Sequence, residues 1–122
     1  MEGYQCGCEP NVFEIFQGED KTMSMRVAFQ QTGLPLDLTE CTEINVALPK
    51  NDGTFINLLL SLAQVSIVSP AVAGQIQVPI TNENSAVLNV GLRQNVDVAF
   101  TIGGLITVVR FLGALSVIQS PV

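Results

Sequence analysis

Apolar and polar residues alternate along most of this chain, and that alternation predicts β-strands. In residues 22–30, Met23, Met25 and Val27 fall on one side, with polar residues such as Ser24 between them. A repeat of two is typical of a half-buried strand, because successive side chains point to opposite faces of a sheet. The same pattern recurs in residues 43–49, 54–60, 62–68, 75–80, 94–102 and 105–118. Together these segments predict an all-β, antiparallel β-sandwich of about eight strands.

Turn residues separate the predicted strands. Asp52-Gly53 and Gly103-Gly104 stand between apolar runs, where residues that tolerate positive φ close tight hairpins. Gly113 interrupts the last alternating run and is expected at a β-bulge. Pro79 has no N–H to donate, so it predicts an edge strand or a strand end.

Residues 81–88 break the alternation and predict a short helical turn near residues 82–88. Thr81 is a suitable N-cap, and Glu83 places negative charge in the first turn. A helix this short forms only with support from its surroundings. We therefore expect one turn that bridges two strands at an end of the sandwich.

The first ten residues have a different composition from the rest. Residues 1–10 contain Tyr4, Cys6 and Cys8 but no apolar repeat, so we expect an N-terminal arm (1–10) before a β-sandwich domain (11–122). Tyr4, Cys6 and Cys8 are our candidate partner-contact residues. The Cys6-Gly7-Cys8 spacing is too tight for a zinc knuckle, which favours reduced thiols, with Cys41 buried, over a metal or redox role.

The composition indicates that the chain has more apolar surface than its own core can bury. Charged residues are 13% of the chain and hydrophobic residues 48%, whereas a soluble domain usually has about 25% charged residues. The surplus apolar surface needs a membrane or partner chains, unless this is an unusually apolar monomer. Neither residues 55–68 nor residues 96–118 offer the run of about 20 apolar residues that a membrane-spanning helix needs. We expect partner chains and no membrane span.

The residue types that the chain lacks argue against most catalytic and nucleic-acid-binding functions. The chain has no histidine, which removes Ser-His-Asp and Cys-His arrangements. Its net charge is −6 with five basic residues, so no basic face for nucleic acid is expected. The acidic pairs lie in turns, where solvated charges are the simplest interpretation. We expect no enzyme, no catalytic residue, no cofactor and no metal site.

The order of the turn motifs carries a family resemblance. The motifs, in chain order, are Gly18-Glu19-Asp20, Gly33-Leu34-Pro35-Leu36-Asp37-Leu38-Thr39, Asp52-Gly53, Gly74-Gln75-Ile76-Gln77-Val78-Pro79-Ile80-Thr81, and Leu88 with Gly91. This order, over residues 12–118, resembles the immunoglobulin-like domain of tailed-phage structural proteins and is similar to the N-terminal domain of phage upper baseplate proteins. The resemblance implies an immunoglobulin-like β-sandwich that docks onto a phage assembly, without catalytic residues.

These observations favour a structural subunit of a tailed-phage virion: a capsid decoration protein, a neck or tail protein, or a baseplate accessory protein. Such a subunit would be made in the bacterial host cytoplasm, since the first residues lack the basic region and apolar run of a signal peptide. Its partners would be other virion proteins, including copies of itself, held by apolar surface, edge-strand pairing and the arm. The alternative is a phage- or bacterium-encoded binding module, an adhesin or a host-directed inhibitor, outside the virion.

Overall fold

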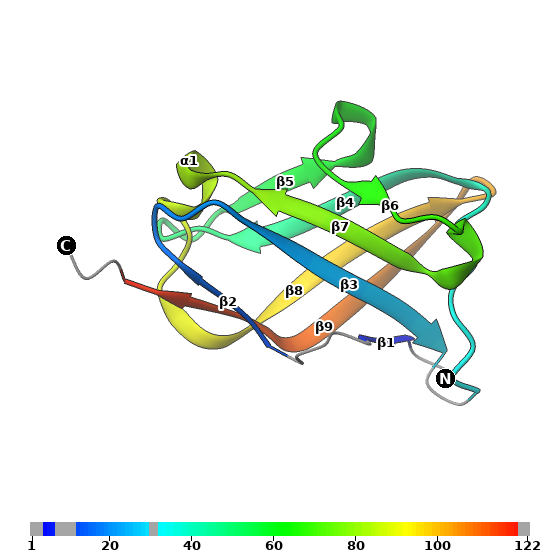
Figure 1. The fold of residues 1–122 in the computed structure, drawn as a ribbon, viewed down its shortest axis with the longest axis horizontal. Coiled ribbons are helices and arrows are strands. Elements are labelled where there is room, and N and C mark those ends of the chain that lie inside the picture. Colours follow the sequence, from blue (N-terminus) through cyan, green and yellow to red (C-terminus); the bar gives the residue numbers. More distant parts are fainter. Residues whose placement is uncertain (1–3, 7–11, 30–31, 120–122) are drawn as a thin grey trace.

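The computed structural model describes residues 4–6, 12–29 and 32–119, and this part of the chain forms nine strands in two sheets that pack face to face (Figure 1). The four-stranded sheet has the order β1 (Tyr4–Cys6), β3 (Lys21–Phe29), β7 (Gln75–Ile80), β6 (Ser66–Ile67). The five-stranded sheet has the order β2 (Phe13–Phe16), β9 (Leu105–Ile118), β8 (Gly91–Ile102), β4 (Cys41–Pro49), β5 (Phe55–Leu59).

This strand order is that of an immunoglobulin-like sandwich. The order β1-β3-β7-β6 corresponds to strands A, B, E and D, and β9-β8-β4-β5 corresponds to G, F, C and C′. The first strand is divided: β1 pairs antiparallel with β3 in one sheet, and β2 pairs parallel with β9 in the other. The predicted all-β immunoglobulin-like sandwich is therefore confirmed, and the β2–β9 ladder is its one parallel pairing in the described residues.

The core lies between the sheets, on the inward side of each alternating strand. The buried side chains from β3, β4, β7 and β8, all under 2% exposed, are Met23, Met25, Val27, Ile44, Val46, Leu48, Ile76, Val78, Ile80, Val96, Val98 and Phe100. Burying each such side chain stabilises the fold by about 1.5–3 kcal/mol. The inward faces predicted from the alternation are confirmed.

The predicted turns and the helical turn are also confirmed. Gly53, Gly103 and Gly104 have positive φ in the β4–β5 and β8–β9 hairpins. The helix α1 (Asn82–Ser85) is capped by the hydroxyl of Thr81, which accepts a hydrogen bond from the Asn84 N–H at 3.2 Å. It lies at one end of the sandwich (Figure 1).

The segment 62–68 differs from its prediction, because only Ser66–Ile67 (β6) is a strand there. The chain turns first through the 3₁₀ segment Leu60–Leu62. The Glu43 carboxylate holds this turn by accepting hydrogen bonds from the N–H and the hydroxyl of Ser61. Such side-chain bonds compete with a strand ladder.

Pro79 was predicted at an edge strand or a strand end, and the structure has the second: β7 lies between β3 and β6, and Pro79 is one residue from its end. It pairs with Thr22 of β3 on one side of β7. On the other side β6 pairs only with Ile76 and Gln77. The proline therefore lies beyond the end of β6, where no ladder partner in the described residues needs its missing N–H.

Candidate protein-interaction face

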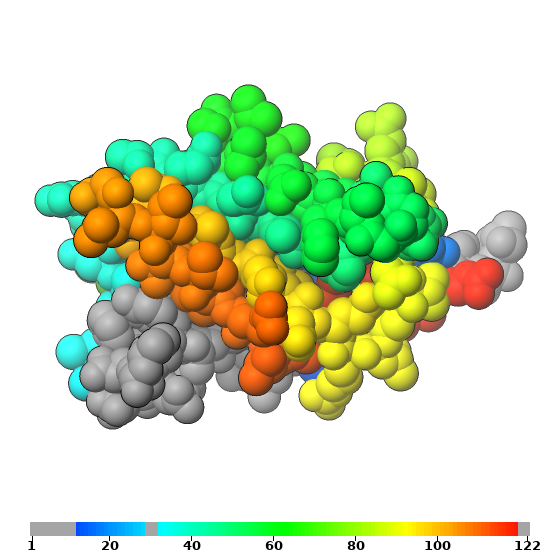
Figure 2. Space-filling model, turned by 180° about the vertical axis from the view of Figure 1, so that it is seen from behind, coloured from blue at the N-terminus to red at the C-terminus, as the bar shows by residue number. Residues whose placement is uncertain are grey.

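The exposed large apolar side chains of the described strands lie in the five-stranded sheet, most clearly on the outer face of β9. Seven large hydrophobic residues are exposed within the described strands, and all seven lie in this sheet: Phe16, Phe55, Leu92, Leu105, Ile106, Val108 and Leu112. Figure 2 shows this face, with β9 (orange), β8 (yellow) and β4 (teal) running side by side. A monomer rarely leaves so many apolar strand residues of one sheet exposed to water.

The strongest part of this face is a row on β9, the β9 ridge, formed by Ile106, Val108 and Leu112. These side chains are 69%, 64% and 76% exposed. Val109 and Phe111, which alternate with them, are buried in the core. Apart from Arg110, the outward positions of β9 from 106 to 112 are thus apolar, although the described residues place no second layer over them.

Small side chains lie next to the ridge. Thr101 and Ala99 on β8 are the cross-strand partners of Ile106 and Val108. On β4, Asn45 pairs with Ala99, and Ala47 with Asp97. We call Thr101, Ala99, Asn45 and Ala47 the small-residue strip. All four are half-buried, so the face has tall apolar side chains on β9 beside short side chains on β8 and β4.

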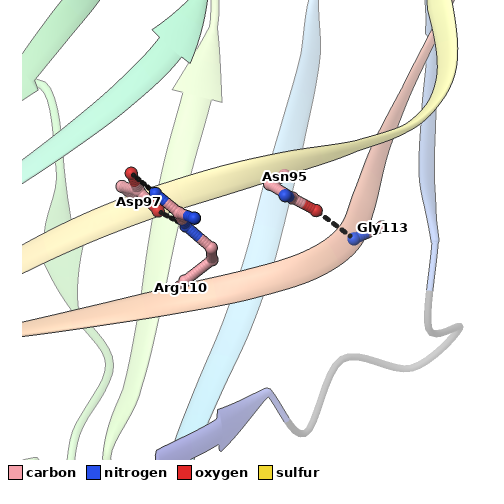
Figure 3. A network of polar contacts seen from close by, with 4 residues as sticks. All are labelled: Asn95, Asp97, Arg110 and Gly113. Carbon is pink, nitrogen blue, oxygen red and sulfur yellow. Dashed lines mark hydrogen bonds and ion pairs between the residues drawn. The ribbon is translucent and has the colours of Figure 1, made fainter.

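One ion pair lies on this face. Arg110 on β9 donates to both carboxylate oxygens of Asp97 on β8, at 2.8 Å from Nε and 3.1 Å from Nη2 (Figure 3). The hydrogen bond and the charge of Arg110 lower the pKa of Asp97, and the same contact raises the pKa of Arg110. The pair is exposed, so water screens it and it adds little to the stability of the isolated chain.

A bulge ends the ridge. The register shifts from Val96↔Phe111 to Gln94↔Leu115, and Gly113 between them has φ +63°. The Asn95 side-chain oxygen accepts a hydrogen bond from the Gly113 N–H at 3.0 Å (Figure 3). The predicted bulge at Gly113 is therefore confirmed, and a side chain of the neighbouring strand holds it in place.

Asn45 carries an unsatisfied polar atom within the small-residue strip. Its Oδ1 is the one buried side-chain oxygen or nitrogen in the described residues that lacks a hydrogen-bond partner. Such an atom costs about 1–3 kcal/mol. Nothing in the core requires an amide here, because Asn45 points away from it, between Ala99 on β8 and Leu59 on β5.

The outer face of the four-stranded sheet has the opposite character. Its outward residues on β3 and β7 include Thr22, Ser24, Arg26, Gln75 and Gln77. Among the side chains of β3, β7 and β6 whose exposure the structure describes, which leaves out Phe29 and β1, no large hydrophobic one is exposed. The described side chains of this face are suited to water, so the exposed apolar side chains of the described strands are one-sided.

Several acidic residues hold turns or loops through hydrogen bonds. Asp37 and Glu40 line a surface depression of about 260 Å³, and the side chain and N–H of Thr39 donate to Asp37 and lower the pKa of its carboxyl. Hydrogen bonds from Ser61 lower the pKa of Glu43. Within residues 4–6, 12–29 and 32–119, no group of His, Cys, Asp and Glu could hold a metal ion. No helix there is long and apolar enough to cross a membrane.

The residues predicted as partner contacts lie elsewhere. Tyr4 and Cys6 belong to β1, which pairs with β3 in the four-stranded sheet, and Cys8 lies outside the described residues. Cys41 is half-buried rather than buried, and its thiol donates to the Glu43 carbonyl at 3.3 Å. Burial raises the pKa of this thiol, so it stays protonated near neutral pH.

Comparison with known proteins does not place the chain in a family. No family model matches the sequence, and no curated protein matches it. Among solved structures, the chain is similar to the Ig-like domain of human Leucine-rich repeat-containing protein 4, with a TM-score of 0.41 and 12% identity over 100% of this chain and 88% of that one. It is also similar to the titin domains z1z2 in complex with telethonin, with a TM-score of 0.40 and 14% identity over 97% of this chain and 46% of that one. The immunoglobulin-like classification rests on the strand order of this chain itself.

Proposed function

We propose that this chain is a structural subunit of a tailed-phage virion, and that it works without catalysis by packing the outer face of its five-stranded sheet against other protein. The β9 ridge is the observation that carries the proposal, because three exposed apolar side chains on one strand need cover. The low charge of the chain and the phage-like order of its turn motifs add support. Its place in the particle can be the capsid surface, the neck, the tail or the baseplate.

Mass spectrometry of purified particles tests this proposal. We expect the wild-type chain in the particles of the phage that encodes it, at many copies per particle. Absence of the chain from purified particles would overturn the proposal and favour the alternative, a binding module that acts outside the virion.

A substitution pair tests whether the ridge mediates incorporation. Val108→Asp puts a charge on the ridge and should lower the copy number at least about tenfold, the effect of ~1.4 kcal/mol in binding. Gln77→Asp adds the same charge to the exposed polar face and should leave the copy number unchanged. Circular dichroism should show both variants folded. Equal incorporation of the two would contradict a role for the ridge.

The predicted role of the arm needs side-chain substitutions rather than a deletion. Removing residues 1–10 would also remove β1 and its ladder with β3. The variants Tyr4→Ala, Cys6→Ser and Cys8→Ser keep the backbone. If the arm anchors the subunit, at least one of them lowers incorporation, and normal incorporation of all three would exclude that role.

A further inference from the structure

We propose that the protein on this face is a second copy of the chain, bound face to face about a two-fold axis that runs between β8 and β9. This inference rests on the proposed function and names the partner of the same surface. Two observations carry it: the distribution of large and small side chains, and the arrangement of the single ion pair on these two strands.

The side-chain sizes are self-complementary. In two successive paired rows, a large residue on β9 lies beside a small one on β8: Ile106 beside Thr101, and Val108 beside Ala99. An axis parallel to the strands and between them places β9 of each copy over β8 of the other. Each large side chain then meets a small one at about 10 Å between sheets, the spacing at which facing sheets fill their interface.

The charges are self-complementary under the same axis. The next row holds Arg110 and Asp97, and the axis sets Arg110 over the partner's Asp97 and Asp97 over the partner's Arg110. A two-fold interface repeats every contact, so this row gives two ion pairs and no facing like charges. The four charged groups would form a network that is better shielded from water than the exposed pair of one copy.

The net charge of the chain also favours a copy as the partner. The protein carries 11 acidic and five basic residues, yet the charges on the outward rows of β8 and β9 from 97 to 110 cancel. At the nearby end of β4, the Glu43 carboxylate is bound to Ser61. Two copies can therefore approach here without the repulsion that the acidic excess causes elsewhere, whereas a basic partner would find no negative face to recognise.

The contact area between the two copies limits the affinity of the dimer. Two to three strands at about 4.8 Å spacing and eight residues of about 3.4 Å each give a flat overlap of about 260–390 Å². Stable dimers bury about 800 Å² per partner. We therefore expect a weak dimer with a Kd of about 0.1 mM, which a particle with many copies would reinforce through its other contacts.

Charge reversal tests the two-fold arrangement by analytical ultracentrifugation at up to about 1 mM chain, ten times the expected Kd. Arg110→Asp gives the face two acids, and Asp97→Arg gives it two bases. Each variant alone should dimerise at least about tenfold more weakly than the wild type, since like charges then face each other. An equimolar mixture should associate again, because every facing pair becomes opposite in sign.

Two further variants control for general effects on the surface. Val108→Asp should abolish dimerisation, and Gln77→Asp on the opposite sheet should leave it at the wild-type level, with both folded by circular dichroism. A wild-type chain that stays monomeric at about 1 mM would overturn the proposed pairing. So would single reversals that dimerise normally, or a mixture that does not associate.

The pairing and the proposed function fail in different ways. A monomeric chain that is still found in purified particles would overturn the second copy as the partner and leave the virion role standing. A dimer that is absent from particles would overturn the virion role and leave the pairing standing.

Discussion

On the four-stranded sheet, Ser24, Arg26 and Gln77 point into solvent, whereas on the five-stranded sheet Val108 and Leu112 do so. Both sheets bury their inward residues equally well, and strands of both contribute side chains under 2% exposed to one core. The difference is therefore unrelated to how the sandwich holds itself together. Apolar residues on the inner faces make the fold, and apolar residues on one outer face are available to a partner.

The largest expected effect comes from comparing a buried residue with an exposed one on adjacent strands of the five-stranded sheet. Phe100 on β8 is fully buried, so Phe100→Ala should lower the free energy of unfolding by about 3–5 kcal/mol. Val108→Ala on β9 removes exposed atoms and should lower it by less than about 1 kcal/mol. Urea unfolding measures both. Similar losses would show that the ridge belongs to the stability of the single chain.

The second prediction compares two glycines with positive φ, one near each sheet. A Cβ on Gly74 would lie 2.7 Å from the Val27 carbonyl oxygen and 2.8 Å from that of Leu36, so Gly74→Ala should cost more than about 2 kcal/mol. A Cβ on Gly113 would come no closer than 3.7 Å to Arg93. Gly113→Ala should then cost only the backbone strain, about 1 kcal/mol. Thermal unfolding compares them, and an equal loss would contradict the assigned role of the contacts at Gly74.

The third prediction concerns the small-residue strip. Asn45→Val removes the unsatisfied Oδ1 and places a good strand former between Ala99 and Leu59, so it should raise the free energy of unfolding by about 1 kcal/mol. Asn57→Val on β5 is the control, since Asn57 is exposed and should change stability less. Urea unfolding decides, and a destabilised Asn45→Val variant would mean that the amide makes a needed contact.

The smallest effect is acid sensitivity. Ser61 and Arg110 hold the pKa values of Glu43 and Asp97 below their ordinary values, so folding favours both charged carboxylates. The stabilisation is complete above the ordinary pKa of about 4 and is lost as the pH falls through the lower folded values. Urea unfolding between about pH 6 and pH 2 should show this loss. The double variant Glu43→Gln, Asp97→Asn should have a flatter profile, and an unchanged slope would contradict the assignment.

The sequence correctly predicted the features that depend on only a few neighbouring residues. The inward residues of β3 and β7, the glycine hairpins, the Thr81 cap and the Gly113 bulge each follow from a few neighbouring residues. The prediction of a strand over residues 62–68 was wrong for most of the segment, because Glu43, 18 residues before Ser61 in the chain, holds the preceding turn. The strands β1 and β2 have three and four residues, too few for a periodic signal.

The candidate face was missed for a different reason. From sequence alone, an apolar run such as 105–112 is as compatible with a strand buried on both faces as with a strand exposed on one face. The strand order, which brings β9 beside β8 with no covering layer in the described residues, decides that one side stays exposed. Composition predicted exposed apolar surface, and the topology locates it on the five-stranded sheet.

Nuclear magnetic resonance of the backbone amides from about 0.05 to 1 mM chain, on either side of the expected Kd, compares the two outer faces most directly. We expect concentration-dependent shifts at Ala99, Thr101, Val108 and Arg110, and constant positions at Ser24, Arg26, Gln75 and Gln77. Constant positions on β8 and β9, or shifts on β3 and β7 instead, would contradict the claim that the five-stranded sheet binds a second copy.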